Sequence, residues 1–180
     1  QRMHRLIEDL LWLARFDKMH RPPAGEPVDL GVLAEQAADR FAVLAEAKSQ
    51  TVVAEVPADS VTVSAPPEWI DQLMGVLLDN ACKYSPQGGA ISLTISAAGG
   101  RATLTVDDSG PGIPEERRER VFDRFHRDSS HAVGAGLGLA IADAIVRATS
   151  GRWLIGTSPM GGARMSVSWA REARERGVPA

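Results

Sequence analysis

The segment TVDDSGPGI, residues 105–113, joins the end of a strand pattern to a turn that contains two glycines. Apolar and polar residues alternate in residues 102–106 and again in residues 91–96, across a glycine-containing connection, which predicts an antiparallel hairpin with one buried face. Asp108 follows directly after the second strand. An ionised carboxylate only accepts hydrogen bonds, which suits the exocyclic amine of adenine, and glycines let the backbone approach a flat base. Taken alone, such a segment is more often only a tight turn.

A second polar group ends a helix predicted over residues 67–84, which begins with a proline at its first position. Its last turns read NACKY, residues 80–84. Steps of three and four residues place Asn80, Lys83 and Tyr84 on one helix face. On that face an amide oxygen can ligate magnesium, an ammonium can meet phosphate and a ring can flank a nucleotide. An asparagine in a helix is, by itself, usually a solvated surface residue.

A third segment, GAGLGL at residues 134–139, precedes a helix predicted over residues 138–148. Bare backbone amides and the positive end of a helix can hold phosphate there. A dinucleotide-binding loop needs a strand leading into G-x-G-x-x-G, whereas this segment has G-x-G-x-G after a polar loop. The chain also contains no G-K-[ST], which excludes a Walker-type phosphate loop. Taken alone, these glycines are as typical of an ordinary loop as of a phosphate-binding one.

The order and spacing of these segments resemble those of a known family. NACKYS, DSGPGIP, VFDRFHR and GLGL, which begin at residues 80, 108, 121 and 136, resemble the N, G1, F and G2 boxes of sensor histidine kinases. Those kinases belong to the Bergerat-fold ATPases, together with gyrase, Hsp90 and MutL. Residues 2–17 look like the second helix of the dimerisation and phosphoacceptor hairpin, which favours histidine kinases over the other members.

The resemblance implies ATP and Mg²⁺ as cofactors and gives each matching residue a role. At the base, Asp108 would bind the adenine amine. Gly110, Gly112 and Ile113 would line the ring, and Tyr84 would flank the nucleotide.

At the phosphates, Asn80 would ligate the magnesium, and Lys83 and Arg127 would approach the phosphate groups. These three are the implied catalytic residues. The lid and the phosphate end of the site would be held by Gly136, Leu137 and Gly138.

The fold so implied is α+β, a two-layer sandwich of the Bergerat (GHKL ATPase) type. A mixed, mostly antiparallel sheet is covered on one face by helices and preceded by an amphipathic helix. We predict the second helix of the hairpin at residues 1–20, a proline-rich linker at 21–28, the catalytic ATP-binding domain at 29–170 and a charged tail at 171–180. The other predicted elements are a helix capped by Asp29, strands near 51–56, 60–64, 153–157 and 165–169, and a short helix near 114–120.

Composition is that of a globular protein, with 44% hydrophobic and 24% charged residues in 180. A net charge of -3 with interleaved signs supplies no field for nucleic acid, so none is expected as a partner. The single cysteine, Cys82, excludes a disulfide framework. The apolar run at residues 10–14 is too short to cross a bilayer. Since the chain opens at Gln1 without an initiator methionine, we interpret it as a fragment, the cytoplasmic domain of a bacterial sensor whose membrane anchor lies upstream.

We therefore expect transfer of the γ-phosphate of Mg-ATP to a histidine on an upstream helix, in a protein that forms a homodimer and signals to a response regulator. In-line transfer needs charge neutralisation and positioning more than covalent help from the protein. None of the chain's four histidines lies in a phosphoacceptor-type sequence. We interpret all four as ordinary polar residues: His4, His20, His126 and His131.

Departures from the family pattern leave an alternative open. Val76 stands where family members usually have a second polar residue, most often Asn, and only six residues separate Arg127 from Gly134 in the lid. Both features suit a nucleotide-binding regulatory module with little kinase activity. An ATP hydrolase like Hsp90 needs a carboxylate at position 76 to activate water, and it fits less well.

Two further departures are expected to affect packing rather than chemistry. Residues 149–151 read TSG where His-Gly-Gly is common, and residues 162–165 read GARM, a loose version of the closing Gly-Thr motif. Phe122 and Phe125 of the F box are likewise expected to pack the lid against the core rather than to contact ATP.

Overall fold

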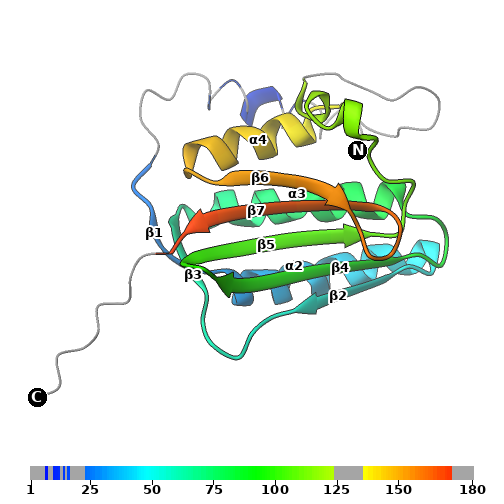
Figure 1. The fold of residues 1–180 in the computed structure, drawn as a ribbon, viewed down its shortest axis with the longest axis horizontal. Coiled ribbons are helices and arrows are strands. Elements are labelled where there is room, and N and C mark those ends of the chain that lie inside the picture. The colour runs from blue at the N-terminus through cyan, green and yellow to red at the C-terminus, as the bar shows by residue number, and fades with distance from the viewer. Residues whose placement is uncertain are drawn as a thin grey trace, which may run out of the picture.

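The computed structural model describes residues 7, 10–12, 14, 16, 23–123 and 136–171. At its centre is a five-stranded sheet with the strand order β2-β4-β5-β7-β6 (Figure 1). In this sheet β2 and β4 are parallel, and the remaining neighbours are antiparallel. The helices cover one face of the sheet, so the predicted two-layer α+β architecture with a mixed, mostly antiparallel sheet is confirmed.

The strands of this sheet are β2 (Thr51–Glu55), β4 (Ala90–Ala98), β5 (Arg101–Asp108), β6 (Arg152–Thr157) and β7 (Ala163–Ala170). The helices are α2 (Leu30–Ala45), α3 (Pro67–Tyr84) and α4 (Gly138–Ala148). A separate two-stranded sheet pairs β1 (Glu26–Asp29) with β3 (Thr62–Ala65). Three short 3₁₀ turns are η1 (Glu46–Lys48), η2 (Glu115–Arg117) and η3 (Arg120–Phe122).

The core lies between the sheet and α3. Alternate residues of β4, β5 and β7 are buried on the helix-facing side, as expected for strands with one solvated face. The largest contributions from α3 are Ile70, Leu73, Met74, Leu77 and Leu78, all at most 2% exposed. Burial of each such side chain contributes roughly 1.5–3 kcal/mol to folding. This packing fixes the last turns of α3 beside the end of β5.

Two local predictions are confirmed by backbone geometry. Asp29 caps α2, since its Oδ1 accepts hydrogen bonds from the amides of Gly31 at 2.8 Å and Val32 at 3.2 Å. Gly99 and Gly100 connect β4 to β5 with φ of 56° and 72°. Positive φ at both central residues matches the twist of the flanking strands, so this turn sets the hairpin register.

The predicted linker at residues 21–28 is wrong at its C-terminal end, because Glu26–Asp29 forms β1 and pairs with β3. Pro27 lies opposite Ser64 in this small sheet, and Val28 is 5% exposed. A proline is tolerated because an edge strand has an amide position that need not bond to a neighbour. The folded unit therefore includes this strand, which precedes the predicted domain boundary at residue 29.

The short helix predicted near residues 114–120 is of the 3₁₀ type. The structure has η2 and η3 there, with hydrogen bonds from the Arg117 amide to the Pro114 carbonyl and from the Arg118 amide to the Glu115 carbonyl. A segment this short cannot offset the cost of nucleating an α-helix, and the tighter i→i+3 turns form in its place.

The described residues of the N-terminal segment are helical, in agreement with the predicted amphipathic helix. Trp12 stacks on Phe16 with ring centroids 5.1 Å apart, and both rings contact Trp69 of α3. Ile7 and Leu10 of the same segment are 48% and 41% exposed. Among the described residues of this segment, the rings of Trp12 and Phe16 therefore pack against the domain.

Within the described part of the chain, no helix combines the length and the apolar character that a membrane span requires. The predicted tail beyond Arg171 lies outside the described residues.

Candidate nucleotide-binding site

Asp108 is the last residue of β5, and its side chain lies between backbone segments that come from distant parts of the chain. Its Oδ1 accepts hydrogen bonds from the amide of Gly110 at 2.8 Å and from the amide of Ala163 at 3.0 Å. Among the described residues, no hydrogen bond to Oδ2 is recorded. One carboxylate oxygen is therefore fixed by the protein, and the other remains available as an acceptor for a ligand.

The turn between β6 and β7 lies directly against Asp108, a contact that the sequence did not predict. A Cβ built on Gly162 would lie 2.2 Å from Asp108 Oδ1 and 2.5 Å from the amide nitrogen of Gly110. A Cβ on Gly112, whose φ is +76°, would meet the Gly162 carbonyl oxygen at 3.4 Å. Segment 162–165 was expected to affect packing alone, but its first two residues contact the carboxylate directly.

The end of α3 lies against the same turn. A Cβ on Gly110 would lie 2.9 Å from the Tyr84 carbonyl oxygen, so glycine is needed for this approach. The Tyr84 side chain is 50% exposed, which leaves its ring free to move over a ligand. The G1-box turn and the N-box helix therefore meet at Gly110 and Tyr84. From the sequence alone, this contact could be expected only from the family resemblance.

Two side chains that the sequence did not single out cap the C-terminal end of α3. Lys48 donates from Nζ to the Cys82 carbonyl at 2.8 Å. The amide of Gln50, which is buried, donates to the Ser85 carbonyl at 2.8 Å and to the Pro86 carbonyl at 3.1 Å. These bonds satisfy helix-end carbonyls that would otherwise lack partners, and they fix the position of the N-box turn.

Asn80 and Lys83 differ in their hydrogen-bond partners. Asn80 Nδ2 is buried and has no hydrogen-bond partner among the described residues. Lys83 pairs through Nζ with Asp79, one helical turn earlier. The unsatisfied amide is costly unless a ligand or water completes its hydrogen bonds, which is typical of a functional site.

The third glycine segment begins α4. Gly136 has φ of +72°, Leu137 is 1% exposed, and no side chain in the described part of the chain caps the helix N-terminus. The side chain of Leu137 therefore belongs to the core, and only its backbone could contact a ligand. A Cβ on Gly138 would meet Val76 Cγ1 at 3.4 Å, so Val76 lies directly beside the exposed amides of this helix end.

Three comparisons with known proteins agree with this geometry. Residues 65–173 match the family described as histidine kinase-, DNA gyrase B- and HSP90-like ATPase. The chain belongs to this ATPase family. It is 34% identical over 163 residues to the adaptive-response sensory kinase SasA of Nostoc sp. strain PCC 7120, covering 88% of this chain and 40% of that relative. With the sensor histidine kinase Hik2 of Thermosynechococcus vestitus it shares 38% identity over 161 residues, 82% of this chain and 40% of the relative.

Solved histidine kinase structures have the same fold. The full-length ShkA structure in complex with AMPPNP superposes with a TM-score of 0.81 at 29% identity, covering 94% of this chain and 36% of that one. The mycobacterial sensor histidine kinase MprB gives a TM-score of 0.72 at 27% identity, covering 83% of this chain and 99% of that one. The chain is thus an ATP-binding kinase domain of the histidine kinase type, and it spans about two-fifths of the curated relatives it matches.

Most of the predicted site residues of this histidine-kinase-type domain gather around the turns at the ends of α3, β5 and β7. Ile113 is partly buried against the core, and its carbonyl accepts a bond from Arg118 Nε at 3.2 Å. Phe122 contacts Trp153 with centroids 4.9 Å apart, in agreement with its predicted packing role. Arg127 and Phe125 lie outside the described residues.

Burial is the largest influence on Asp108 and raises the pKa of its carboxyl above the ordinary 3.8. The Ala163 and Gly110 amides act in the opposite direction, and the charge of Asp107 raises this pKa further. The pKa of Asp108 is higher in the folded than in the unfolded state, so protonation of this carboxyl stabilises the folded protein. This contribution to the free energy of unfolding is complete below the unfolded-state pKa. It is lost as the pH rises through the folded pKa.

A pH dependence of nucleotide binding follows from the same shift. The resemblance implies that the carboxylate of Asp108 accepts the adenine amine, so we expect ADP affinity to fall as the pH is lowered from neutrality through the raised pKa of Asp108. Calorimetric titration across this range checks the expectation, with Asp108→Asn as the control that lacks a titrating group. Equal pH dependence in both proteins would mean that another group controls binding.

Proposed function

We propose that this domain binds Mg-ATP and transfers its γ-phosphate to a histidine on a helix that precedes it in the full-length protein. The observation that carries the proposal is the environment of Asp108. Its Oδ1 is held by two backbone amides, and Oδ2 has no recorded partner among the described residues. A fixed acceptor of this kind, between glycine-containing turns, suits the amine of adenine. Gly110, Gly112 and Ile113 would line the base.

The residues present fit a magnesium ion. The side-chain oxygen of Asn80 is a ligand type that Mg²⁺ accepts, and its buried Nδ2, which has no partner among the described residues, could donate to a phosphate oxygen. Within the described residues, no group of three or more His, Cys, Asp or Glu side chains could hold a metal. Asn80 would therefore bind the ion together with phosphate oxygens and water. The bound ion would neutralise charge on the phosphates.

Positive charge and free amides would hold the triphosphate. Lys83 follows Asn80 by three residues on α3, which places both on one helix face, and its ammonium pairs with Asp79 in the described structure. The uncapped N-terminus of α4, at Gly138, offers backbone amides and the positive end of the helix dipole. In-line transfer depends mainly on such positioning. We propose that Arg127 adds a further charge from the lid.

The rest of the signalling protein follows from the family as a set of proposals. The phosphoacceptor histidine would lie on an upstream helix that pairs with the N-terminal helical segment of this chain. Two copies would form a homodimer through these helices, and the phosphoryl group would pass to a response regulator. The domain would be the cytoplasmic part of a membrane-anchored bacterial sensor, with no nucleic acid partner.

The test is phosphoryl transfer in the full-length protein supplied with γ-labelled ATP and magnesium. We expect label on a histidine outside residues 1–180, and labelling about tenfold to a hundredfold slower when Asp108 is replaced with asparagine at an ATP concentration that limits the wild-type rate. Release of labelled phosphate without protein labelling would contradict the kinase assignment and favour ATP hydrolysis.

A nucleotide-binding regulatory module with little kinase activity is a second candidate, and Val76 is the observation that favours it. Its side chain packs beside Gly138 at the phosphate end of the site, where an apolar group can neither ligate metal nor orient the terminal phosphate. Such a site would retain ADP binding while transferring phosphate slowly.

We therefore predict that Val76→Asn raises the autophosphorylation rate of the full-length protein, because an amide there can complete the metal shell and position the γ-phosphate. ADP affinity without magnesium should change little. Single-turnover labelling measures the rate, and Val76→Ala is a matched control that removes the same packing without adding a polar group. An unchanged or lower rate in the asparagine variant would show that Val76 acts through packing alone.

A further inference from the structure

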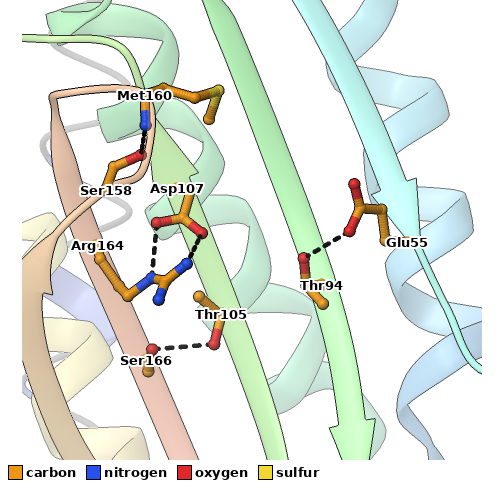
Figure 2. Close-up of polar contacts among 8 residues, drawn as sticks. All are labelled: Glu55, Thr94, Thr105, Asp107, Ser158, Met160, Arg164 and Ser166. Atoms are coloured by element: carbon orange, nitrogen blue, oxygen red, sulfur yellow. Dashed lines mark hydrogen bonds and ion pairs between the residues drawn. The ribbon is translucent and has the colours of Figure 1, made fainter.

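An ion pair on the open face of the sheet lies directly behind the adenine-recognition carboxylate. Arg164 of β7 donates from Nε and Nη2 to the two carboxylate oxygens of Asp107 of β5, each at 2.8 Å (Figure 2). The Asp107 side chain is 6% exposed and that of Arg164 39%. A bidentate pair of this kind constrains orientation as well as separation.

The pair occupies a specific position in the strand ladder. Asp107 and Arg164 are register partners in the β5–β7 pairing, and each is adjacent in sequence to a residue of the proposed nucleotide site. Asp108 follows Asp107, and Ala163 precedes Arg164. Successive side chains in a strand point to opposite faces, so the ion pair holds the strands from one face while Asp108 accepts the Ala163 amide on the other.

The turn between β6 and β7 lies next to the Asp107–Arg164 pair, and its own hydrogen bonds restrict how it can adjust to a shift of β7. The Met160 amide donates to Ser158 Oγ at 3.0 Å (Figure 2). The Ser158 amide also donates to the Gly162 carbonyl at 2.9 Å, so the turn is closed by its own hydrogen bonds. Gly162 leaves no room for a Cβ against Asp108. A small shift of β7 along β5 would therefore move Gly162 and Ala163 together relative to the carboxylate.

We infer that Asp107 and Arg164 form a positioning pair, which sets the register of β7 so that the Ala163 amide holds Asp108 in the orientation that reads adenine. Neither residue contacts the nucleotide. The inference rests on the proposed function, since it assigns these residues a role in base recognition. It predicts a selective loss of adenine recognition, rather than a general loss of affinity, when the pair is broken.

The chain offers a matched control at the other end of the same strand pair. Arg101 of β5 donates from Nη2 to the Ser168 carbonyl of β7 at 2.8 Å and from Nε to Ser168 Oγ at 3.1 Å. This arginine also links β5 to β7, but it is remote from Asp108 along the strand. Arg101→Met therefore removes a cross-strand arginine without changing the rung beside the site.

The experiment compares two ligands by calorimetry in the full-length protein: ADP and purine riboside 5′-diphosphate, which lacks the exocyclic amine. We expect Arg164→Met to weaken ADP binding about tenfold, as for one well-placed hydrogen bond. The amine-free analogue should change by less than about twofold, because its contacts do not involve Asp108. Arg164→Lys, which keeps the charge but not the fork, should recover part of the discrimination, and Arg101→Met should retain all of it.

Other outcomes distinguish failure of the positioning role from failure of the adenine assignment. If Arg164→Met binds both ligands equally weakly, or discriminates as the wild type does, the positioning role is wrong. If that variant fails to fold, Asp107→Asn and Arg164→Lys answer the same question, because both keep most of the local shape. If the wild type does not distinguish ADP from the analogue, or Asp108→Asn still does, the adenine assignment fails and the positioning role fails with it.

Discussion

Replacing Asp108 with asparagine is expected to weaken ADP binding about tenfold to a hundredfold. The asparagine oxygen can still accept the Gly110 and Ala163 amides, but its NH₂ group then faces the adenine amine, so a donor meets a donor. Loss of a hydrogen bond to a charged group costs roughly 1.5–3 kcal/mol. Titration calorimetry with ADP measures the change.

Stability gives this variant an internal check. Burial disfavours the ionised form of Asp108 in the folded protein, so removing the charge should leave the melting temperature of the nucleotide-free domain unchanged or higher at neutral pH. Asp71→Asn is the matched control, since this carboxylate pairs with Arg40 at the surface and lies outside the site. Equal ADP affinities in the wild type and Asp108→Asn would remove Asp108 from base recognition.

Gly162→Ala is expected to reduce ADP affinity at least as much as Asp108→Asn does. The added Cβ would lie 2.2 Å from Asp108 Oδ1 and 2.3 Å from the Asp108 carbonyl oxygen, so either the carboxylate or the β6–β7 turn must move. Overpacking of this kind costs typically about 1–3 kcal/mol of stability, and the displaced carboxylate also loses its contact with the base. Calorimetric ADP titration and thermal unfolding should therefore both show losses.

The same hairpin contains a suitable control. A Cβ on Gly156 of β6 would meet Arg164 Cβ only at 4.0 Å, an ordinary contact, so Gly156→Ala should bind ADP as the wild type does. If Gly162→Ala binds ADP normally, the turn is not the wall of the adenine site.

Local signals were sufficient for much of the fold. The alternation on both sides of Gly99 and Gly100 identified the β4–β5 hairpin, and positive φ at both glycines is the reason that the signal was reliable. Asp29 and Pro67 marked helix starts because capping and proline preferences depend on a few adjacent residues. The same rules failed at β1, where the pairing of Val28 with Val63 depends on a contact between distant segments.

The same difference between local signals and long-range contacts applies to the site. Asp108 and Asn80 could be proposed as site residues from the sequence, because their segments carry recognisable residue types at fixed spacing. Ala163 contributes a backbone amide to Asp108 from 55 residues away, and a backbone donor leaves no mark in side-chain identity. Asp107 precedes Asp108 in the sequence, and its pairing with Arg164 depends on a strand register that the sequence does not reveal.

In the proposed site, one oxygen of Asp108 is held by the protein while the other accepts a hydrogen bond from the adenine amine. A crystal structure of the domain with ADP tests it most directly. We predict the exocyclic amine within about 2.7–3.2 Å of Asp108 Oδ2, with Oδ1 still accepting the amides of Gly110 and Ala163. An adenine ring bound elsewhere, or an amine that faces a different acceptor, would contradict the account.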